Sequence, residues 1–290
     1  NGRLNMSITD SNEYGTLYLC ATPIGNLEDM TYRAVRILGE VELIAAEDTR
    51  HTRQLLTHFA IHTKLTSYHE HNKFTKGPEL IDYLHSGKDL VCVSDAGLPG
   101  ICDPGSHLAE LAIAQGIRVS PLPGANAGLS ALICSGLDTT LFTFVGFLPR
   151  TAKKQQEKLS QVQDYAGTLI FYEAPHHLKG TLKAIYSVLG DRKAVLGREL
   201  TKKFEEFRRG TLSELLSYYE SETPRGEFVI LVAGTSENET KAEPIINASP
   251  VELCQKFIAE GMDKKEAMRK TAKTLGISRR EVYKSLLAED

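Results

Sequence analysis

Short apolar runs alternate with longer amphipathic stretches along the first part of the chain. Apolar runs of a few residues predict buried strands, and apolar positions three or four residues apart predict helices. We expect strands at residues 16–21, 41–46, 90–94 and 117–122, and helices at 31–38, 49–59 and 105–115, with one more helix ending at 82–86. Strands that are apolar almost throughout and alternate with helices indicate a largely parallel sheet covered on both faces.

The pattern changes after the Pro-Leu-Pro-Gly turn at residues 121–124. Further strands are expected at 142–145, 169–172, 194–198, 207–209 and 228–233, and helices at 151–163, 175–189 and 212–219. The close spacing of two of these strands around residues 201–206 indicates a hairpin, so this second sheet should be mixed. Residues 235–249 are polar and typical of a linker. We therefore expect α/β domains at 14–122 and 123–236 and a small helical extension at 248–290.

The extension has the spacing of a helix-turn-helix. We expect helices at 267–275 and 278–287, separated by Gly276 and with Ser278 as the N-cap of the second. In a helix-turn-helix the second helix contacts nucleic acid, whereas a small packing bundle is the alternative. Residues 261–290 contain eight Lys or Arg against five acidic residues, a charge of +3, while the whole chain carries -3. A basic segment on an acidic body favours a local contact with an anionic partner.

Composition narrows the class of protein. Hydrophobic residues make up 41% and charged residues 24% of the chain, which is typical of a globular protein. No apolar run approaches the roughly 20 residues of a membrane helix, so no membrane contact is expected. The five cysteines are an odd number without metal-like spacing, and we interpret them as reduced thiols in a cytoplasmic protein. They are Cys20, Cys92, Cys102, Cys134 and Cys254.

Three loops that follow predicted strands are rich in Gly, Pro and small residues. They are residues 22–26 (Thr-Pro-Ile-Gly-Asn), 94–105 and 121–127. The second has three glycines and two prolines in a dozen residues, far more than a connection of about 2 to 6 residues needs. Such loops lie at the carboxyl ends of strands, where α/β sheets bind ligands through the backbone. The alternatives are a plain connector for the first loop and a hinge for the third. Neither a GxGxxG nor a GxxxxGK[ST] pattern occurs, which argues against NAD and ATP.

Charged clusters near strand ends are the other candidates. Glu47, Asp48 and Arg50 follow the second strand, where the acids are candidate bases or orienting groups; the alternative is a capped helix start with an exposed arginine. His69 and His71 share a strand face but lack further ligands, so no metal site is expected. A basic set around the predicted hairpin favours either phosphate contact or a solvated surface: Lys202, Lys203, Arg208 and Arg209.

Six motifs, in order, resemble those of the tetrapyrrole (corrin/porphyrin) methylase family. They are Leu-Cys-Ala-Thr-Pro-Ile-Gly-Asn-Leu-Glu-Asp, Ala-Glu-Asp-Thr-Arg, Ser-Asp-Ala-Gly-Leu-Pro-Gly, Pro-Gly-Ala-Asn-Ala, Phe-Tyr-Glu-Ala-Pro-His-His and Gly-Arg-Glu-Leu-Thr-Lys-Lys. The resemblance covers residues 16–233 and is closest to the family's bacterial ribosomal RNA members, whose C-terminal extension the tail also resembles. Tetrapyrrole enzymes of the family usually carry a Gly-Gly-Asp-Pro loop where this chain has Ala96-Gly97-Leu98-Pro99, which argues against a corrin substrate.

The resemblance implies two α/β domains with S-adenosylmethionine in the cleft between them, and a homodimer. It implies cofactor contacts, mostly through the backbone, at Pro23, Ala96, Gly97, Leu98, Ile101, Asn126, Ala127, Glu173, Leu200 and Gly226. The implied activity is 2′-O-methylation of a cytidine ribose in small-subunit ribosomal RNA, on the free RNA or the assembled subunit, without a metal. We expect Glu47 or Asp48 to act as base and Arg50 to orient the substrate, while basic residues dock the RNA. Besides the hairpin set and the tail, these are Arg150, Lys153 and Lys154.

Two rival functions remain open on the sequence. A corrin or porphyrin methyltransferase of the same fold would leave the basic tail without a purpose. A ligand-sensing regulator that binds nucleic acid through its tail would bind the cofactor without consuming it.

Overall fold

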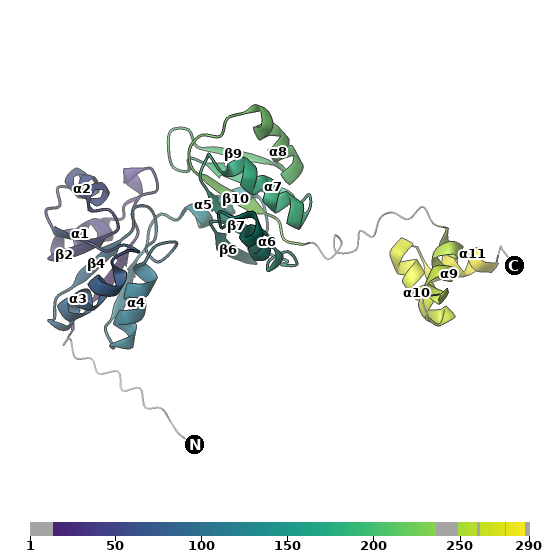
Figure 1. Cartoon of the computed structure of the whole chain (residues 1–290), viewed down its shortest axis with the longest axis horizontal. Helices are drawn as coiled ribbons and strands as arrows, with labels where there is room; N and C mark the ends of the chain where they lie inside the picture. Colours follow the sequence, from purple (N-terminus) through teal and green to yellow (C-terminus); the bar gives the residue numbers. More distant parts are fainter. Residues whose placement is uncertain (1–13, 236–248, 260–261, 276, 288–290) are drawn as a thin grey trace, which may run out of the picture. The chain divides into compact units, whose positions relative to one another are not determined.

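The computed structural model describes residues 14–235, 249–259, 262–275 and 277–287 (Figure 1). The chain divides into two compact units at Gly234 and Thr235. The first unit holds both sheets and the second holds the C-terminal helices, and each is described by itself. Most of the expected linker, residues 236–248, lies outside the described residues.

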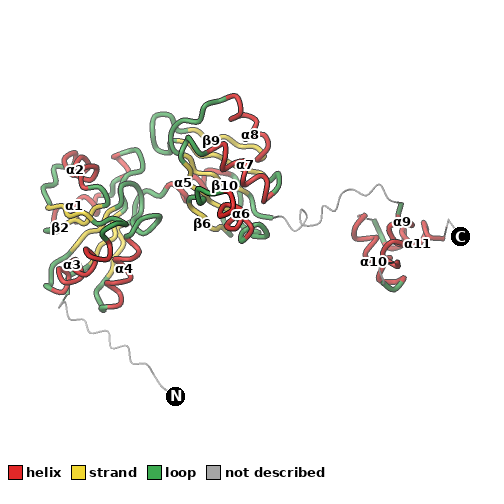
Figure 2. The backbone as a smooth tube through the Cα atoms, viewed as in Figure 1, coloured by secondary structure: helices red, strands yellow, loops and turns green. Residues whose placement is uncertain are grey.

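The first sheet has five strands in the order β3-β2-β4-β1-β5. They are β1 (Leu17–Cys20), β2 (Leu43–Ala46), β3 (Lys64–Ser67), β4 (Leu90–Val93) and β5 (Val119–Leu122). Every strand pair is parallel. All of the strands therefore end at the same edge of the sheet, and the loops that follow them gather there (Figure 2). The parallel sheet expected from the sequence is confirmed.

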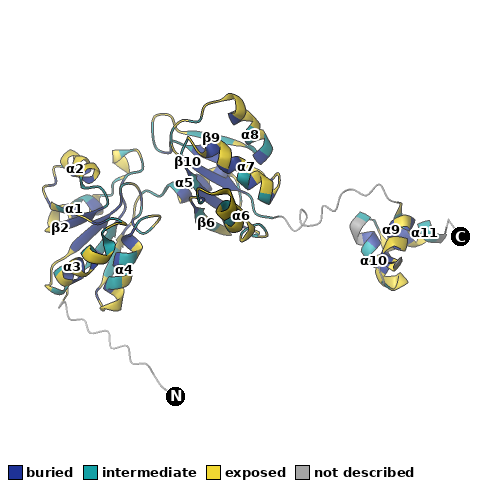
Figure 3. Cartoon of the chain, viewed as in Figure 1, coloured by how far each residue is buried: buried dark blue, intermediate teal, exposed yellow. Residues whose placement is uncertain are grey.

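Helices cover both faces of this sheet because each strand buries alternate side chains in opposite directions. Val91 and Val93 of β4 belong to one core cluster with helices α1 (Tyr32–Glu40) and α2 (Thr49–His58). Leu90 and Cys92 belong to another cluster with α3 (Lys73–His85) and α4 (Gly105–Ala114). A short 3-10 helix, η1 (Leu27–Asp29), precedes α1. Burial on both faces accounts for the continuous apolar runs of the central strands (Figure 3).

Strand β3 has no counterpart among the expected strands. It lies at the edge of the sheet and pairs only with β2. Its ends, Lys64 and Ser67, are exposed and its two middle residues are half-buried. An edge strand of this kind needs no apolar run, so hydrophobic periodicity gives it no signal.

The second sheet is mixed, as expected, with the order β6-β7-β10-β8-β9. Its strands are β6 (Phe142–Gly146), β7 (Thr168–Glu173), β8 (Lys193–Arg198), β9 (Glu206–Thr211) and β10 (Phe228–Val232). Strands β6 and β7 are parallel, and the other pairs are antiparallel. The predicted hairpin is confirmed as β8 and β9, joined by the loop at residues 199–205.

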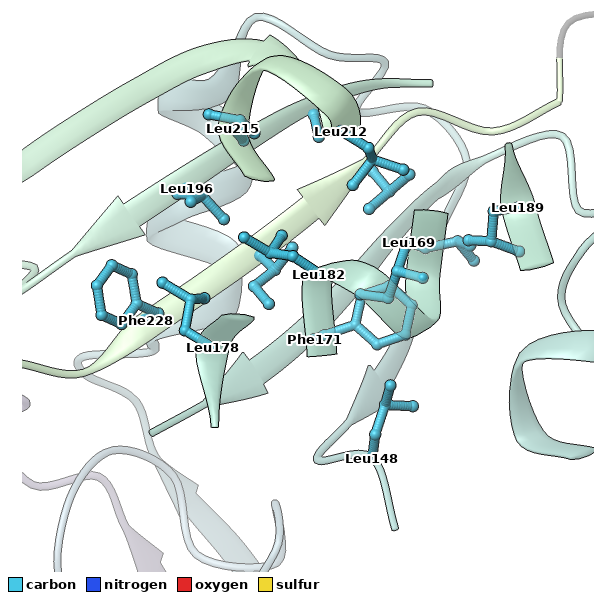
Figure 4. Packing of buried hydrophobic residues seen from close by; sticks show 14 of the residues in the cluster. Leu148, Leu169, Phe171, Leu178, Leu182, Leu189, Leu196, Leu212, Leu215 and Phe228 are labelled. Atoms are coloured by element: carbon cyan, nitrogen blue, oxygen red, sulfur yellow. The ribbon is translucent and has the colours of Figure 1, made fainter. Parts of the chain in front are cut away.

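Three helices pack on one face of the second sheet and one on the other. Helices α6 (Ala152–Ser160), α7 (Leu178–Leu189) and α8 (Leu212–Ser221) share a core with Phe171, Leu196 and Phe228 (Figure 4). Helix α5 (Ala127–Ser135) packs through Ala131 and Leu132 on the opposite face. The small residues of α5 allow this close approach to the sheet.

The C-terminal unit is a bundle of three helices, α9 (Pro250–Ala259), α10 (Lys264–Leu275) and α11 (Arg279–Leu287). Its core includes residues from all three helices, among them Phe257, Met268 and Val282. The expected pair of helices corresponds to α10 and α11, and Ser278 caps α11 by accepting from the Glu281 N–H at 3.2 Å. Gly276 lies outside the described residues. Helix α9 was not anticipated as a separate helix.

Among the described helices, none is long and apolar enough to cross a membrane. All five cysteines are free thiols, with Cys20, Cys92 and Cys254 buried and Cys102 and Cys134 exposed. Cys134 lies in an apolar stretch of sequence, but it is on the outer side of α5.

Candidate active site

Two loops are joined at the carboxyl edge of the first sheet. The Thr22 N–H donates to the Gly97 carbonyl at 2.9 Å and the Gly97 N–H donates back at 3.1 Å, forming an isolated antiparallel bridge. The Thr22 hydroxyl also donates to the Ser94 carbonyl at 3.2 Å. The loop after β1 and the loop after β4 are therefore held as one surface.

The long loop after β4 is stiffened by a carboxylate. Oδ1 of Asp103 accepts from the N–H groups of Gly100 and Gly105, both at 2.8 Å. Gly97 and Gly100 have φ values of +78° and +90°, which L side chains rarely adopt. A Cβ at Gly105 would lie only 2.6 Å from the Gly100 nitrogen, so the loop cannot close on itself with a larger residue there.

These loops line a pocket of about 380 Å³, within the range of roughly 300–1,000 Å³ that suits a ligand of drug size. The first sheet contributes loop residues after β1, β2, β4 and β5, and the second sheet contributes residues at the ends of its strands. The lining consists of Ile24, Glu47, Ser94, Asp95, Ala96, Gly97, Leu98, Ile101, Cys102, Asp103, Asn126, Ala127, Phe147, Tyr172, Glu173, Ala174, Leu200, Glu227, Phe228 and Val229.

Most of the residues expected to contact a cofactor are brought together by this pocket. Eight of the ten line it, namely Ala96, Gly97, Leu98, Ile101, Asn126, Ala127, Glu173 and Leu200. Pro23 and Gly226 are not lining residues, although each is next to one, Ile24 and Glu227 respectively. Asn126 is also the N-cap of α5, because its Oδ1 accepts from the Leu129 N–H at 2.8 Å. The start of α5 is thereby fixed at the pocket wall.

Lys202 stabilises the loop between β8 and β9 through contacts with three other residues. Its Nζ lies 2.9 Å from Oε1 of Glu199 and 2.9 Å from Oε2 of Glu227, and a Cβ at Gly25 would collide with its side chain. Burial alone would raise the pKa of Glu199, but hydrogen bonds from Lys202 and the Glu227 backbone outweigh it and lower that pKa. Glu199 and Thr201 have φ values of +49° and +64°. This strained loop presents Leu200, which lies between them, to the pocket.

The structure separates the three candidate catalytic residues. Only Glu47 lines the pocket. Burial raises its pKa, and the negative charges of Asp95 and Asp103 raise it further. Glu47 follows β2, so the strand end delivers its carboxyl group to the edge where the loops meet.

Asp48 and Arg50 instead form a helix cap and an ion pair. Asp48 is the N-cap of α2 and accepts from the Arg50 N–H at 2.8 Å. Its other oxygen lies 2.8 Å from the guanidinium of Arg50, whose side chain is 89% exposed. The hydrogen bonds from the Arg50 side chain and backbone lower the pKa of Asp48 to about 2. The alternative of a capped helix start with an exposed arginine therefore describes this pair.

The basic set of the hairpin is mostly engaged within the chain. Besides Lys202, the guanidinium of Arg208 pairs with Glu206 and lies 3.6 Å from the ring centroid of Tyr218. Arg209 donates to the carbonyl of Ser135 at 3.1 Å and caps α5 from its C-terminal side. These three cations hold the hairpin in place, which the charge pattern alone did not reveal.

Several lining residues were not among the candidates found in the sequence. The Tyr172 hydroxyl accepts from the Gly128 N–H at 2.9 Å, and its ring meets Phe147 edge-on with centroids 5.8 Å apart. Asp103 has a buried Oδ2 without a hydrogen-bond partner in the described part of the chain. The signals were present, because Tyr172 stands in the Phe-Tyr-Glu motif and Asp103 in the glycine-rich loop, but their roles depend on contacts distant in sequence.

The lining is acidic. It includes Glu47, Asp95, Asp103, Glu173 and Glu227, and none of the described lining residues is lysine, arginine or histidine. The described residues also contain no group of three or more His, Cys, Asp or Glu that could hold a metal ion. Such a wall favours an organic ligand that carries positive charge and an apolar face.

Residues 16–216 match the family of Tetrapyrrole (Corrin/Porphyrin) Methylases. The chain belongs to the tetrapyrrole methylase family. A tetrapyrrole methylase is a methyltransferase that uses S-adenosylmethionine, whose sulfonium and ammonium groups are cationic. The acidic wall, the unpartnered oxygen of Asp103 and the apolar faces of Leu98, Leu200 and Val229 fit this cofactor.

Relatives match this tetrapyrrole methylase over almost its entire length. A protein of Halalkalibacterium halodurans named "Ribosomal RNA small subunit methyltransferase I" is 49% identical, covering 97% of this chain and 98% of its own. A protein of Bacillus subtilis with the same name is 46% identical, covering 97% of each chain. The crystal structure of uroporphyrin-III-C-methyltransferase from Thermus thermophilus superposes with a TM-score of 0.54 at 19% identity, covering 75% of this chain and 94% of that one. This last likeness shows the fold alone.

The glycine at the joined loops provides a test of the pocket. In Gly97→Ala the new Cβ would lie 3.4 Å from the side chain of Ile24, and it would reduce the space between these two lining residues. We expect the dissociation constant for S-adenosylmethionine to rise by about tenfold or more, because one misplaced methylene in a fitted site has an effect of this order. Isothermal titration calorimetry measures it. Gly116→Ala is the matched control, since Gly116 has a φ of +72° but open space around its Cβ. Equal affinity in both variants would contradict the placement of Gly97 at the cofactor.

Proposed function

We propose that this protein methylates ribosomal RNA of the small subunit, at the 2′-hydroxyl of a cytidine ribose. The observation that carries the proposal is the extent of the likeness to relatives named for that class of substrate. The family match ends at residue 216, whereas the likeness to the relatives covers 97% of the chain and so includes much of the C-terminal extension. A substrate that needs the extension is therefore favoured over a tetrapyrrole, for which the pocket-bearing domains alone suffice.

We assign separate tasks to three parts of the chain. Domains at residues 14–122 and 123–236 hold the cofactor and the reacting ribose, and the helical extension at 248–290 docks RNA. Exposed cations follow two lining residues in the sequence: Arg50 comes three residues after Glu47, and Arg150, Lys153 and Lys154 come shortly after Phe147, around the start of α6. Contacts of these residues with phosphate position an RNA without reading its sequence. The proposed location is the cytoplasm, where ribosomal RNA is found.

Glu47 is the residue that we propose as the base. S-adenosylmethionine would supply an electrophilic methyl group, and the sulfur–methyl bond would break to release a neutral thioether, which needs little help from an acid. The ribose hydroxyl is a weak nucleophile, so Glu47 accepts its proton as the new oxygen–carbon bond forms. The raised pKa makes Glu47 a stronger base than an ordinary carboxylate. Asp48 orients Arg50, which leaves the guanidinium exposed for a phosphate or a substrate hydroxyl.

We also propose a homodimer, closed by an apolar face of the second sheet and α5. Strand β6 is an edge strand whose Phe142 and Phe144 are exposed, and α5 exposes Leu129 and Ile133. Tyr172 connects the two elements, because its ring meets Phe144 edge-on at 4.9 Å while its hydroxyl bonds α5. An unprotected apolar edge strand favours self-association, and a second copy of the chain would cover it.

The substrate is tested by methyl transfer from labelled S-adenosylmethionine to small ribosomal subunits, free ribosomal RNA and a tetrapyrrole extract in parallel. We expect label on ribose in the RNA or the subunit, and a large loss of that label when residues 250–290 are deleted, because docking then weakens. Cofactor affinity is the control for the deleted chain. Label confined to the tetrapyrrole extract would overturn the RNA substrate, and binding of the cofactor without any transfer would favour the sensing regulator.

Glu47→Gln tests the base. The variant should lower kcat by about 10²- to 10⁴-fold, the usual contribution of a positioned base. In the unaltered enzyme, kcat should fall as acid protonates Glu47, at a pH above that expected for an ordinary glutamate, because its pKa is raised.

The raised pKa also affects stability. The folded state binds this proton more tightly than the unfolded chain, so Glu47 disfavours folding increasingly as pH rises through its pKa. Glu47→Gln should therefore also increase the free energy of unfolding at neutral pH.

Asp48→Asn is the matched control for Glu47→Gln, since Asn also caps helices well and Asp48 titrates near pH 2. It should keep the acid limb of the pH profile and most of kcat. An unchanged acid limb in Glu47→Gln would eliminate Glu47 as the base.

The dimer is tested by light scattering after size exclusion. The unaltered chain should have twice the mass of one chain, and the double variant Ile133→Glu, Phe144→Glu should have the mass of one, because two charges would be buried in an apolar interface. Ile113→Glu is the control, because Ile113 is exposed on α4, on the first sheet. A monomeric unaltered chain, or a dimer that survives the double substitution, would refute this interface.

A further inference from the structure

Three aromatic side chains are more exposed than any other phenylalanine or tyrosine in the described residues. Tyr32 is 98% exposed, Phe74 is 73% exposed and Phe204 is 64% exposed. A single exposed apolar residue is ordinary on a protein surface. These three, however, lie toward the same edge of the first sheet, and two of them each have a lysine next to the ring.

All three lie on the side of the first unit that carries the pocket. Tyr32 begins α1 after the loop that follows β1, and Phe74 lies in the first turn of α3 after the loop that follows β3. Parallel strands end at one edge, so both are at the edge where Glu47 and the glycine-rich loops lie. Phe204 is in the loop between β8 and β9, and Lys202 of that loop packs on Gly25 at the same edge.

Two of the rings carry a lysine beside them. Nζ of Lys73 lies 5.1 Å from the ring centroid of Phe74, and Nζ of Lys203 lies 5.7 Å from that of Phe204. Lys73 is also paired with Oε1 of Glu70 at 2.7 Å, whereas Lys203 is exposed. The positive charge offered to an anion therefore lies beside Phe204, and Phe74 offers chiefly its aromatic surface. The pair of Phe204 and Lys203 is suited to a flat, uncharged ring that is attached to an anion.

The ring of Phe74 is also held in position. It meets the imidazole of His107 edge-on with centroids 5.3 Å apart, and Nδ1 of His107 is hydrogen-bonded to the Tyr68 hydroxyl at 2.8 Å. Tyr68 is buried and its backbone N–H donates to the Ala46 carbonyl, next to Glu47. Because these contacts already fix the ring, it would lose little further conformational freedom when a ligand binds.

We propose that Phe74, Phe204 with its neighbouring lysine, and Tyr32 stack on unpaired nucleobases that flank the methylated ribose. The proposal rests on the proposed function and deepens it, because it identifies single-stranded RNA as the form recognised at the mouth of the pocket. Aromatic stacking with a neighbouring cation is how proteins hold unpaired nucleotides. The three rings spread the strand at the pocket edge so that one ribose reaches Glu47.

Substitution separates stacking from a general apolar contact. Phe74→Ala and Phe204→Ala should each raise KM for the ribosomal RNA or subunit about 5- to 100-fold, the range for loss of one stacked base. Phe204→Leu keeps apolar volume without a ring face and should be as impaired as Phe204→Ala, whereas Phe204→Tyr should restore binding. The dissociation constant for S-adenosylmethionine should stay unchanged throughout. Tyr186→Ala on α7 is the control for an exposed aromatic elsewhere.

A direct reading of stacking is available because the chain contains no tryptophan. Phe74→Trp and Phe204→Trp each introduce a single indole, whose fluorescence should be quenched when a short unstructured oligoribonucleotide is added without cofactor. Tyr186→Trp should not respond. Lys203→Gln should reduce the slope of log affinity against log salt by about one.

The outcomes distinguish this proposal from the proposed function. Quenching without any methyl transfer to RNA would retain the stacking surface and overturn the activity. Normal transfer with unchanged KM in every aromatic variant would overturn the stacking surface and retain the activity. Rescue by leucine would point to a protein partner, and a change in mass by light scattering would place these rings in a subunit contact; either result overturns the proposal.

Discussion

The pair of hydrogen bonds between Thr22 and Gly97 is the interaction on which the rest of the site depends. It joins the loops after β1 and β4, which are neighbouring strands, beyond the point where the sheet ends. Without it each loop would be a separate connection free to move over the strand ends. With it, the backbone of both loops becomes a continuation of the sheet, and the positive φ of Gly97 lets that continuation turn to form a wall.

The acidity of the pocket follows from the same edge. The ends of β2 and β4 bring Glu47 close to Asp95 and Asp103, which share the loop after β4. Burial is the larger cause of the raised pKa of Glu47 and of Asp103, and the repulsion among these carboxylates adds to it. Like charges confined in a partly buried site cost free energy unless a cation offsets them. The folded chain therefore holds a charge arrangement that a cationic ligand stabilises, as is common at sites selected for binding rather than for stability.

The sequence predicted the central strands, which are buried on both sides, and missed the edge strand β3. Strand β4 was recognisable because Leu90 and Val91 face different cores, both apolar. Strand β3 at the sheet edge has exposed ends and half-buried middle residues, and so has no apolar run. The glycine-rich loops were found because their composition exceeds what a turn needs. In the second wall of the pocket, Glu173 and Leu200 were expected through the family resemblance alone. Tyr172 and Val229 were not expected, since they are ordinary strand residues until the fold brings them to the loops. Likewise the Asp48 and Arg50 pair was ambiguous until its hydrogen bonds identified a helix cap.

Helix α5 has two faces with different consequences. Its first turn, with Asn126 as cap and Ala127 as lining residue, belongs to the pocket wall, and its outer side exposes Leu129 and Ile133. A nine-residue helix moves as a rigid rod, so an event at one face displaces the other. If self-association shifts α5, it changes the affinity for the ligand in the wall, and by thermodynamic reciprocity the ligand changes the strength of association by the same factor. The two equilibria of this protein would then be linked through one short helix, without any further allosteric element.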